Sequence, residues 1–208
     1  MDFAYPLIGL ALAHLLAVAS LGPSFVLIAQ TAAGTSRRAA LVATLGLTLG
    51  AAIWAAAALF ALQALFTRFD WLYVALRIGG GAYLVWIGYL LIRHAGQGAN
   101  AEPAPATAAA AGEGAIFVKA LLLQLSNPKV IVFFAGVFAA LLPRDASPGM
   151  SPAALAVVAG NEFGYYALVS MLFSRDGARR VYDRARMWIE RITGGVLALL
   201  GLKLVFDR

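Results

Sequence analysis

The chain has 208 residues, of which 62% are hydrophobic and only 12% are charged. Soluble domains contain about 45–50% apolar residues even when glycine is counted, and about a quarter of their residues are charged, so this composition excludes a soluble globule. Large aliphatic and aromatic residues occur throughout and the glycines follow no triplet period, which excludes a disordered chain and a collagen-like fibre. An integral membrane protein remains.

Six apolar stretches are each long enough to cross a bilayer as a helix, which takes about 20 mainly apolar residues. They cover residues 3–36, 39–67, 71–92, 116–142, 146–174 and 188–206. None shows the alternating polarity of barrel strands. Because the chain begins Met1-Asp2, without the positive charge of a secretory signal, we interpret the first stretch as a span as well.

The basic residues predict the orientation of these spans. With six spans, loops one, three and five hold ten basic residues and the other side holds five. The positive-inside rule therefore places loops one, three and five in the cytoplasm and both termini outside the plasma (inner) membrane. The most charged segment, 174–191, is interpreted as a short amphipathic helix on the inner leaflet, attracted by anionic headgroups, rather than as a nucleic-acid surface.

A stretch rich in Ala, Gly and Pro divides the chain into two halves. Residues 94–115 read as a flexible cytoplasmic linker between a first three-helix repeat, 1–93, and a second, 116–208. An odd number of spans per half places the halves in opposite orientations. Glycine pairs recur in order in both halves. They match Gly46 and Gly50 with Gly160 and Gly164, and Gly81 and Gly88 with Gly194 and Gly201.

The first span of each half contains an interior proline, in Gly22-Pro23 and in Asn127-Pro128. Proline lacks an amide donor, so the carbonyls of Ala19 and Gln124 lose their intrahelical partners. One such proline would be a packing kink. Two at matching places resemble the discontinuous helices of transporters. We therefore expect an all-α membrane protein of six transmembrane helices, arranged as two inverted three-helix repeats with Pro-broken first and fourth helices.

These motifs also resemble a known family. The stretches are Gly22-Pro23-Ser24-Phe25, the glycines at 46 and 50, GGGAYLVWIGYLLIR over 79–93, Asn127-Pro128-Lys129, and the pair of phenylalanines at 133 and 134. Together they look like the LysE/RhtB family of amino-acid exporters, and the likeness covers nearly the whole chain. The resemblance implies export of amino acids or related small zwitterionic metabolites from the cytoplasm.

Two ionisable residues lie near the centres of apolar stretches. Lys129 is too far from either end of its stretch for its side chain to reach the interface, and Glu162 is central in the fifth stretch. A charge at the bilayer centre costs about 2.5–3.5 kcal/mol, so each is the other's obvious partner. The repeat alignment places Ser24 opposite Lys129 and Thr48 opposite Glu162. We predict that all four side chains surround one cavity.

A zwitterionic substrate could place its carboxylate near Lys129 and near a half-helix N-terminus at Ser24 or Asn127. Its ammonium would then approach Glu162 and the freed carbonyls. The alternative is a permanent ion pair between Lys129 and Glu162 that only locks two helices together. The sequence leaves both readings open.

The energy source is a separate question. The chain contains no nucleotide-binding P-loop, and the resemblance implies a secondary, proton-driven carrier working by alternating access. Glu162 and His14, in the outer half of the first span, are candidate proton carriers. His14 could equally be a hydrogen-bonded packing residue.

Other functions fit the residues less well. A metal-ion exporter or channel needs clustered metal ligands, and two histidines, no cysteine and one central Glu do not supply them. A membrane enzyme needs a nucleophile and a base. A non-transporting assembly module predicts neither central charges nor matched helix breaks. We expect a transporter with no cofactor and no nucleic-acid partner, and the helix glycines leave a homo-oligomer open.

Overall fold

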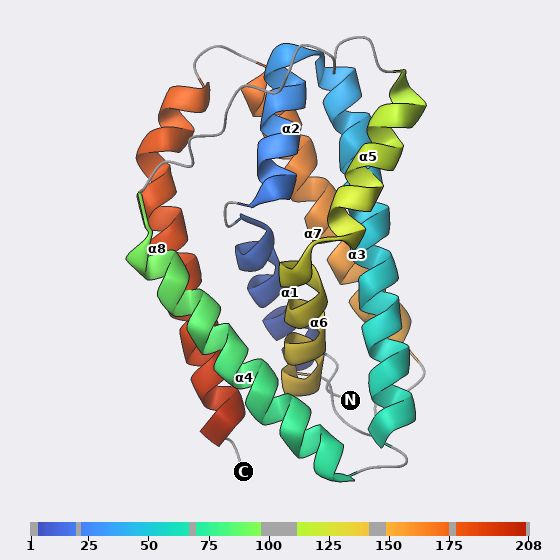
Figure 1. Cartoon of the computed structure of the whole chain (residues 1–208), viewed down its shortest axis with the longest axis vertical. Coiled ribbons are helices and arrows are strands. Elements are labelled where there is room, and N and C mark those ends of the chain that lie inside the picture. Colours follow the sequence, from blue (N-terminus) through green and yellow to red (C-terminus); the bar gives the residue numbers. More distant parts are fainter. Residues whose placement is uncertain are drawn as a thin grey trace.

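The computed structural model describes residues 4–19, 22–66, 70–96, 112–141, 149–174 and 178–206. Within these residues every regular element is an α-helix (Figure 1). The helices are α1 (Ala4–Ala19), α2 (Pro23–Gly34), α3 (Arg37–Phe66), α4 (Asp70–Arg93), α5 (Glu113–Leu125), α6 (Pro128–Leu141), α7 (Met150–Phe173) and α8 (Ala178–Phe206).

Both helix breaks predicted from proline are present. Pro23 is the first residue of α2 and Pro128 the first residue of α6. Proline suits this position because the first amide of a helix has no intrahelical partner. The axes of α1 and α2 meet at 61°, and those of α5 and α6 at 56°. Each bent pair therefore has a helix C-terminus and a helix N-terminus in the middle of the molecule.

The helices alternate in direction along the long axis of the molecule. In Figure 1, α1 and α2 together run from the lower to the upper end, α3 returns, and α4 runs upward again. After the linker, α5 and α6 together run downward, α7 upward and α8 downward. Each element of the second half thus runs opposite to its counterpart in the first.

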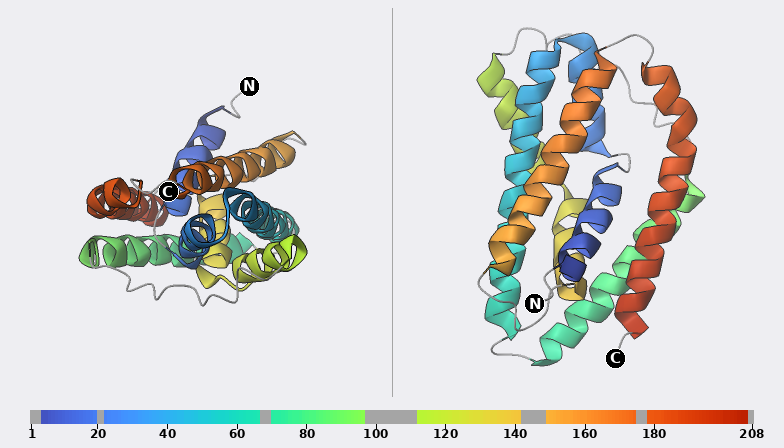
Figure 2. Two further views of the ribbon diagram at one scale, coloured as in Figure 1. Left: turned by 90° about the horizontal axis from the view of Figure 1, so that it is seen from above. Right: turned by 180° about the vertical axis from the view of Figure 1, so that it is seen from behind.

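Helices α4 and α8 lie side by side, and glycines bring their backbones together (Figure 2). A Cβ added to Gly88 would meet the carbonyl oxygen of Gly194, and one added to Gly201 would meet that of Gly81. Small residues at such crossings allow close van der Waals packing, which is what holds helices together in lipid. The match of Gly81 and Gly88 with Gly194 and Gly201 therefore falls on one interface, in crosswise pairs.

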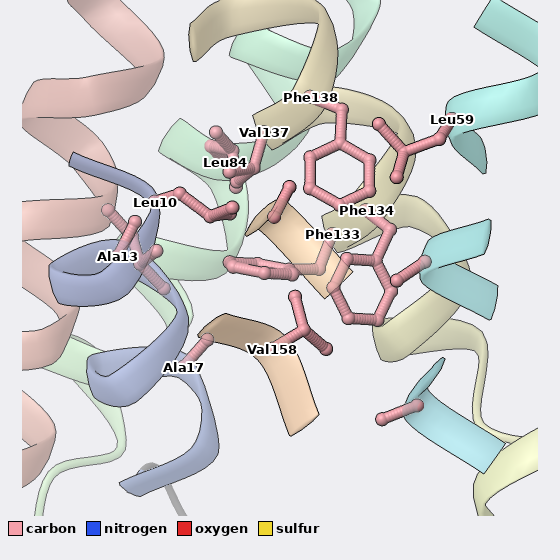
Figure 3. Close-up of a cluster of buried hydrophobic side chains, with 14 residues drawn as sticks. Leu10, Ala13, Ala17, Leu59, Leu84, Phe133, Phe134, Val137, Phe138 and Val158 are labelled. Atoms are coloured by element: carbon pink, nitrogen blue, oxygen red, sulfur yellow. The ribbon is translucent and has the colours of Figure 1, made fainter. Parts of the chain in front are cut away.

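The apolar core is centred on α6. Phe134 and Phe138 are fully buried, and Figure 3 shows them among residues of α1, α3 and α7 that include Ala17, Leu59 and Val158. Packing to this density fixes the position of α6, because a rigid ring tolerates few neighbouring arrangements. The residues at the start of α6 are thereby held at the centre of the molecule.

Large apolar side chains cover the exterior, while several polar side chains are buried. Phe60 is 70% exposed and Leu199 67%, whereas Glu162 is 2% exposed. This inverted distribution fits a lipid environment and not water. By length and composition, two helices of the described residues could each cross a membrane, or up to four spans if each bent pair counts as one.

Two predictions about loops have different outcomes. Most of the predicted linker, residues 97–111, lies outside the described residues. The short, separate amphipathic helix predicted over 174–191 is wrong, because most of that segment forms the start of α8, which is continuous from Ala178 to Phe206. No proline interrupts α8, so the charged turns extend the last predicted span as one helix.

Candidate functional site

One cavity lies where the two helix breaks face each other and α7. It has room for about 40 Å³ and is lined by residues of both halves. Its polar wall consists of His14, Ser24, Gln124, Asn127, Lys129 and Glu162, and its apolar wall includes Val18, Val130, Phe133 and Phe134. A space that combines opposite charges with an apolar wall suits a small amphiphilic molecule.

Lys129 caps the C-terminal end of α1. Its Nζ donates a hydrogen bond to the carbonyl oxygen of Ala17 at 3.0 Å. The last carbonyls of a helix lack intrahelical partners and carry partial negative charge, which a cation stabilises. The Tyr165 hydroxyl of α7 donates to the carbonyl of Ala19 at 3.4 Å. Carbonyls freed by the first break are therefore satisfied by side chains of the second half.

The second break satisfies its own backbone differently. The carbonyl of Gln124 accepts from the amide of Asn127 at 3.2 Å, within the turn between α5 and α6. The Asn127 side-chain Oδ1 in turn accepts from the amide of Lys129 at 3.1 Å, which is an N-cap for α6. Gly22, by contrast, precedes α2 in an extended conformation with no side-chain cap, and it lines the cavity. Of the two helices that begin at the breaks, α6 is thus capped by the side chain of its N-cap residue, and α2 is not.

A chain of side-chain hydrogen bonds crosses the cavity from α2 to α7. The Ser24 hydroxyl donates to Gln124 Oε1 at 2.7 Å, and Gln124 Nε2 donates to Glu162 Oε1 at 2.7 Å. All three side chains are buried. Buried networks of this kind are costly unless each member has a partner, so they fix the geometry of the groups they join.

The second oxygen of Glu162 faces His14. His14 Nε2 lies 3.5 Å from Glu162 Oε2. The imidazole stacks on Phe134 with ring centroids 5.5 Å apart and lies 5.8 Å from Phe133. In the part of the chain that the structure describes, its Nδ1 has no hydrogen-bond partner. Glu162 therefore has an amide on one oxygen and a titratable ring beside the other.

The cavity gathers most of the residues that the sequence predicts. Ser24, Asn127, Lys129, Glu162 and His14 all line it. The two prolines stand at the breaks and begin their helices without lining the cavity.

Thr48, which the sequence also predicts at the site, does not line this cavity. Gly46 and Gly50 form the face of α3 that packs against α5, and Thr48 points about 160–200° away from it at 100° per residue. Its buried hydroxyl has no hydrogen-bond partner among the described residues. The repeat alignment does not contain the direction in which a side chain points.

Sequence reasoning missed the side chain of Gln124. An amide within an apolar stretch, four residues before the proline of a predicted break, was the available signal. The described residues contain no group of three or more His, Cys, Asp or Glu side chains that could hold a metal ion.

With this geometry in view, the chain can be compared with known proteins. A family model described as LysE type translocator matches residues 15–208. The chain belongs to the LysE type translocator family. It is a multi-pass membrane protein, and the resemblance stated from its motifs is confirmed.

Named relatives cover nearly the full length. The chain is 34% identical to the threonine efflux protein of Escherichia coli (strain K12) and 33% identical to that of Salmonella typhi, each over 95% of this chain and 96% of the relative. It is 29% identical to an uncharacterized membrane protein of Haemophilus influenzae over 97% of this chain and 96% of that protein. No solved structure matches this chain.

Proposed function

We propose that this translocator is a secondary transporter that exports a small neutral amino acid from the cytoplasm, with threonine as the first candidate substrate. The observation that carries the proposal is the meeting of Lys129 and Glu162 at one cavity between two broken helices. The full-length relatives named as threonine efflux proteins support the substrate class.

The cavity offers separate places for the two charges of an amino acid. The substrate carboxylate binds Lys129 and the uncapped N-terminus of α2. A lysine ammonium has three donors, so Lys129 can keep its bond to the Ala17 carbonyl while it binds a carboxylate. The substrate ammonium binds Glu162. The apolar wall formed by Phe133 and Val130 receives a short side chain.

The two halves of the chain, which run in opposite directions, provide the basis for alternating access. Contacts between the halves are reciprocal: Ser24 in the first turn of α2 bonds to the end of α5, and Lys129 in the first turn of α6 bonds to the end of α1. The crosswise glycine pairs between α4 and α8 fit the same two-fold relationship. Rocking of one half against the other about the cavity exposes it to each side in turn.

This architecture has six spans, with the bent pairs, α3, α4, α7 and α8 each crossing once. Loops one, three and five then lie at the end where α3 begins with Arg37 and Arg38. The positive-inside rule assigns that end to the cytoplasm and both termini to the outside of the inner membrane.

Proton coupling follows if the Glu162 carboxylate binds either a proton or the substrate ammonium. A proton and the substrate ammonium compete for the same carboxylate, so protonation of Glu162 from outside releases the amino acid. His14, 3.5 Å away, passes the proton to or from Glu162. The transporter therefore exchanges one proton for one amino acid per cycle.

Export from cells tests this proposal. Cells that lack their own exporters are fed a threonine-containing dipeptide, and external threonine is measured with the wild-type chain and with Glu162→Gln. The matched control is Glu113→Gln, which removes a half-exposed carboxylate whose partner is Arg38. We expect wild type and the control to export threonine and Glu162→Gln to fail at equal membrane abundance. Undiminished export by Glu162→Gln would contradict the proposal and favour a purely structural ion pair.

A further inference from the structure

One polar side chain of the cavity contacts three other helices at once. Gln124, near the end of α5, is buried, with its amide between Ser24 of α2 and Glu162 of α7 at 2.7 Å from each. Its Cβ and Cγ lie against Gly50 of α3, where any side chain would collide with them. The glutamine is therefore fixed along its whole length.

The two hydrogen bonds of Gln124 have the polarity expected of a substrate. Toward Ser24 the amide accepts, as a substrate carboxylate would. Toward Glu162 the amide donates, as a substrate ammonium would. A neutral amide thus reproduces both ends of a zwitterion within one side chain.

The space left beside Gln124 is small. A cavity needs about 10–15 Å³ for each water molecule, so about 40 Å³ holds roughly three waters. An amino acid is larger than this. It cannot bridge Ser24 and Glu162 while the amide of Gln124 occupies the space between them.

We propose that Gln124 occupies the position of the substrate in this conformation and that an entering amino acid displaces it from Ser24 and Glu162. This inference rests on the proposed function. Gln124 is then a positioning residue: it joins Ser24 to Glu162 before the substrate enters, and it competes with the substrate. The apparent affinity for substrate is lowered by the hydrogen bonds that must first be broken.

Transport kinetics of the purified protein in liposomes test the proposal, with labelled threonine as the probe. Gln124→Ala removes the amide, and Gln124→Met removes it while keeping a stem to pack against Gly50. We expect both to lower the KM for threonine by about ten- to hundred-fold, because a hydrogen bond to a charged group no longer opposes binding. The control is Asn161→Ala, which removes an amide bonded to the carbonyl of Ala11 outside the cavity lining and should leave KM unchanged.

The alternatives give different kinetics. A raised KM in both Gln124 variants would make Gln124 a substrate ligand and overturn the inference. A lowered maximal rate with unchanged KM would make its role merely structural and also overturn it. If the wild-type protein moves no amino acid, the proposed function fails and this inference falls with it. Normal wild-type kinetics with an unchanged or raised KM in the variants overturn this inference alone.

Discussion

Lys129 and Ala17 are joined across the two halves of the chain by a hydrogen bond of 3.0 Å from an ammonium to a backbone carbonyl. A broken helix leaves carbonyls without partners, and a lysine at the membrane centre needs an acceptor. The lysine ammonium therefore supplies a donor to the carbonyl, and the carbonyl supplies an acceptor to the ammonium. A lysine ammonium has three donors, so this bond is compatible with a further hydrogen bond from Lys129 to a substrate carboxylate.

Lys129 and Glu162 can be tested together by a double-mutant cycle. Lys129→Met alone should lower the melting temperature, because it removes the hydrogen bond to the Ala17 carbonyl and the positive charge near Glu162. The free energy of unfolding should fall by about 3–5 kcal/mol. Adding Glu162→Gln should recover part of that stability but not transport. Melting in detergent and threonine uptake are the two measurements. Recovery of transport by the double variant would show that Lys129 and Glu162 only hold their two helices together and do not bind the substrate.

Gly50 should be intolerant of a side chain. Its Cβ would lie 2.8 Å from Cβ of Gln124, so Gly50→Ala must displace the end of α5, at a cost of about 1–3 kcal/mol. Gly164→Ala is the matched control, because Gly164 is its counterpart in the repeat alignment and a Cβ there meets nothing within 4 Å. The control should be neutral or slightly stabilising. Thermal unfolding followed by size-exclusion chromatography compares them, and equal stability would contradict the packing described here.

The α4–α8 interface makes a similar prediction. Gly88→Ala should separate the two helices and lower stability, because the new methyl group meets the backbone of Gly194. Gly195→Ala, one residue beyond Gly194, faces open space and should be tolerated. Cysteine crosslinking between α4 and α8 reports their separation. Equal crosslinking in both variants would contradict the backbone contact.

His14 should affect coupling more than binding. His14→Gln removes the ring beside Glu162 Oε2, so threonine export driven by a pH gradient should fall by about 100-fold or more, a size typical of lost general acid–base groups. Exchange of internal for external threonine needs no net proton movement and should persist. His94→Gln, at the exposed end of α4, is the control. Equal loss of both activities would make His14 a packing residue.

Much of the site could be predicted because its signals are local. Pro23 and Pro128 break helices wherever they stand in an interior, and Lys129 and Glu162 are conspicuous for the cost of burying charge. The structure places both breaks and both charges at one cavity. The role of each of these residues follows from its residue type and its position within an apolar stretch.

The other features of the site depend on how each helix is rotated about its axis and on which helices pack against it. The order of residues in the sequence does not contain this information. Thr48 does not line the cavity, because Gly46 and Gly50 form the face of α3 that packs on α5 and Thr48 points away from that face. Gln124 carries no charge, so the sequence does not single it out. Its role follows from its hydrogen bonds to Ser24 of α2 and Glu162 of α7. The halves also differ in detail, since Gly46 and Gly50 pack on α5 whereas Gly160 and Gly164 meet nothing within 4 Å.

The central claim is that an amino acid binds between Lys129 and Glu162 and crosses the membrane there. Counterflow tests it most directly: liposomes containing the purified protein are loaded with unlabelled threonine and diluted into a trace of labelled threonine. The account predicts transient accumulation of label by the wild type and by Glu113→Gln, and none by Lys129→Ala or Glu162→Gln that fold normally. Accumulation by both cavity variants at the wild-type rate would contradict it.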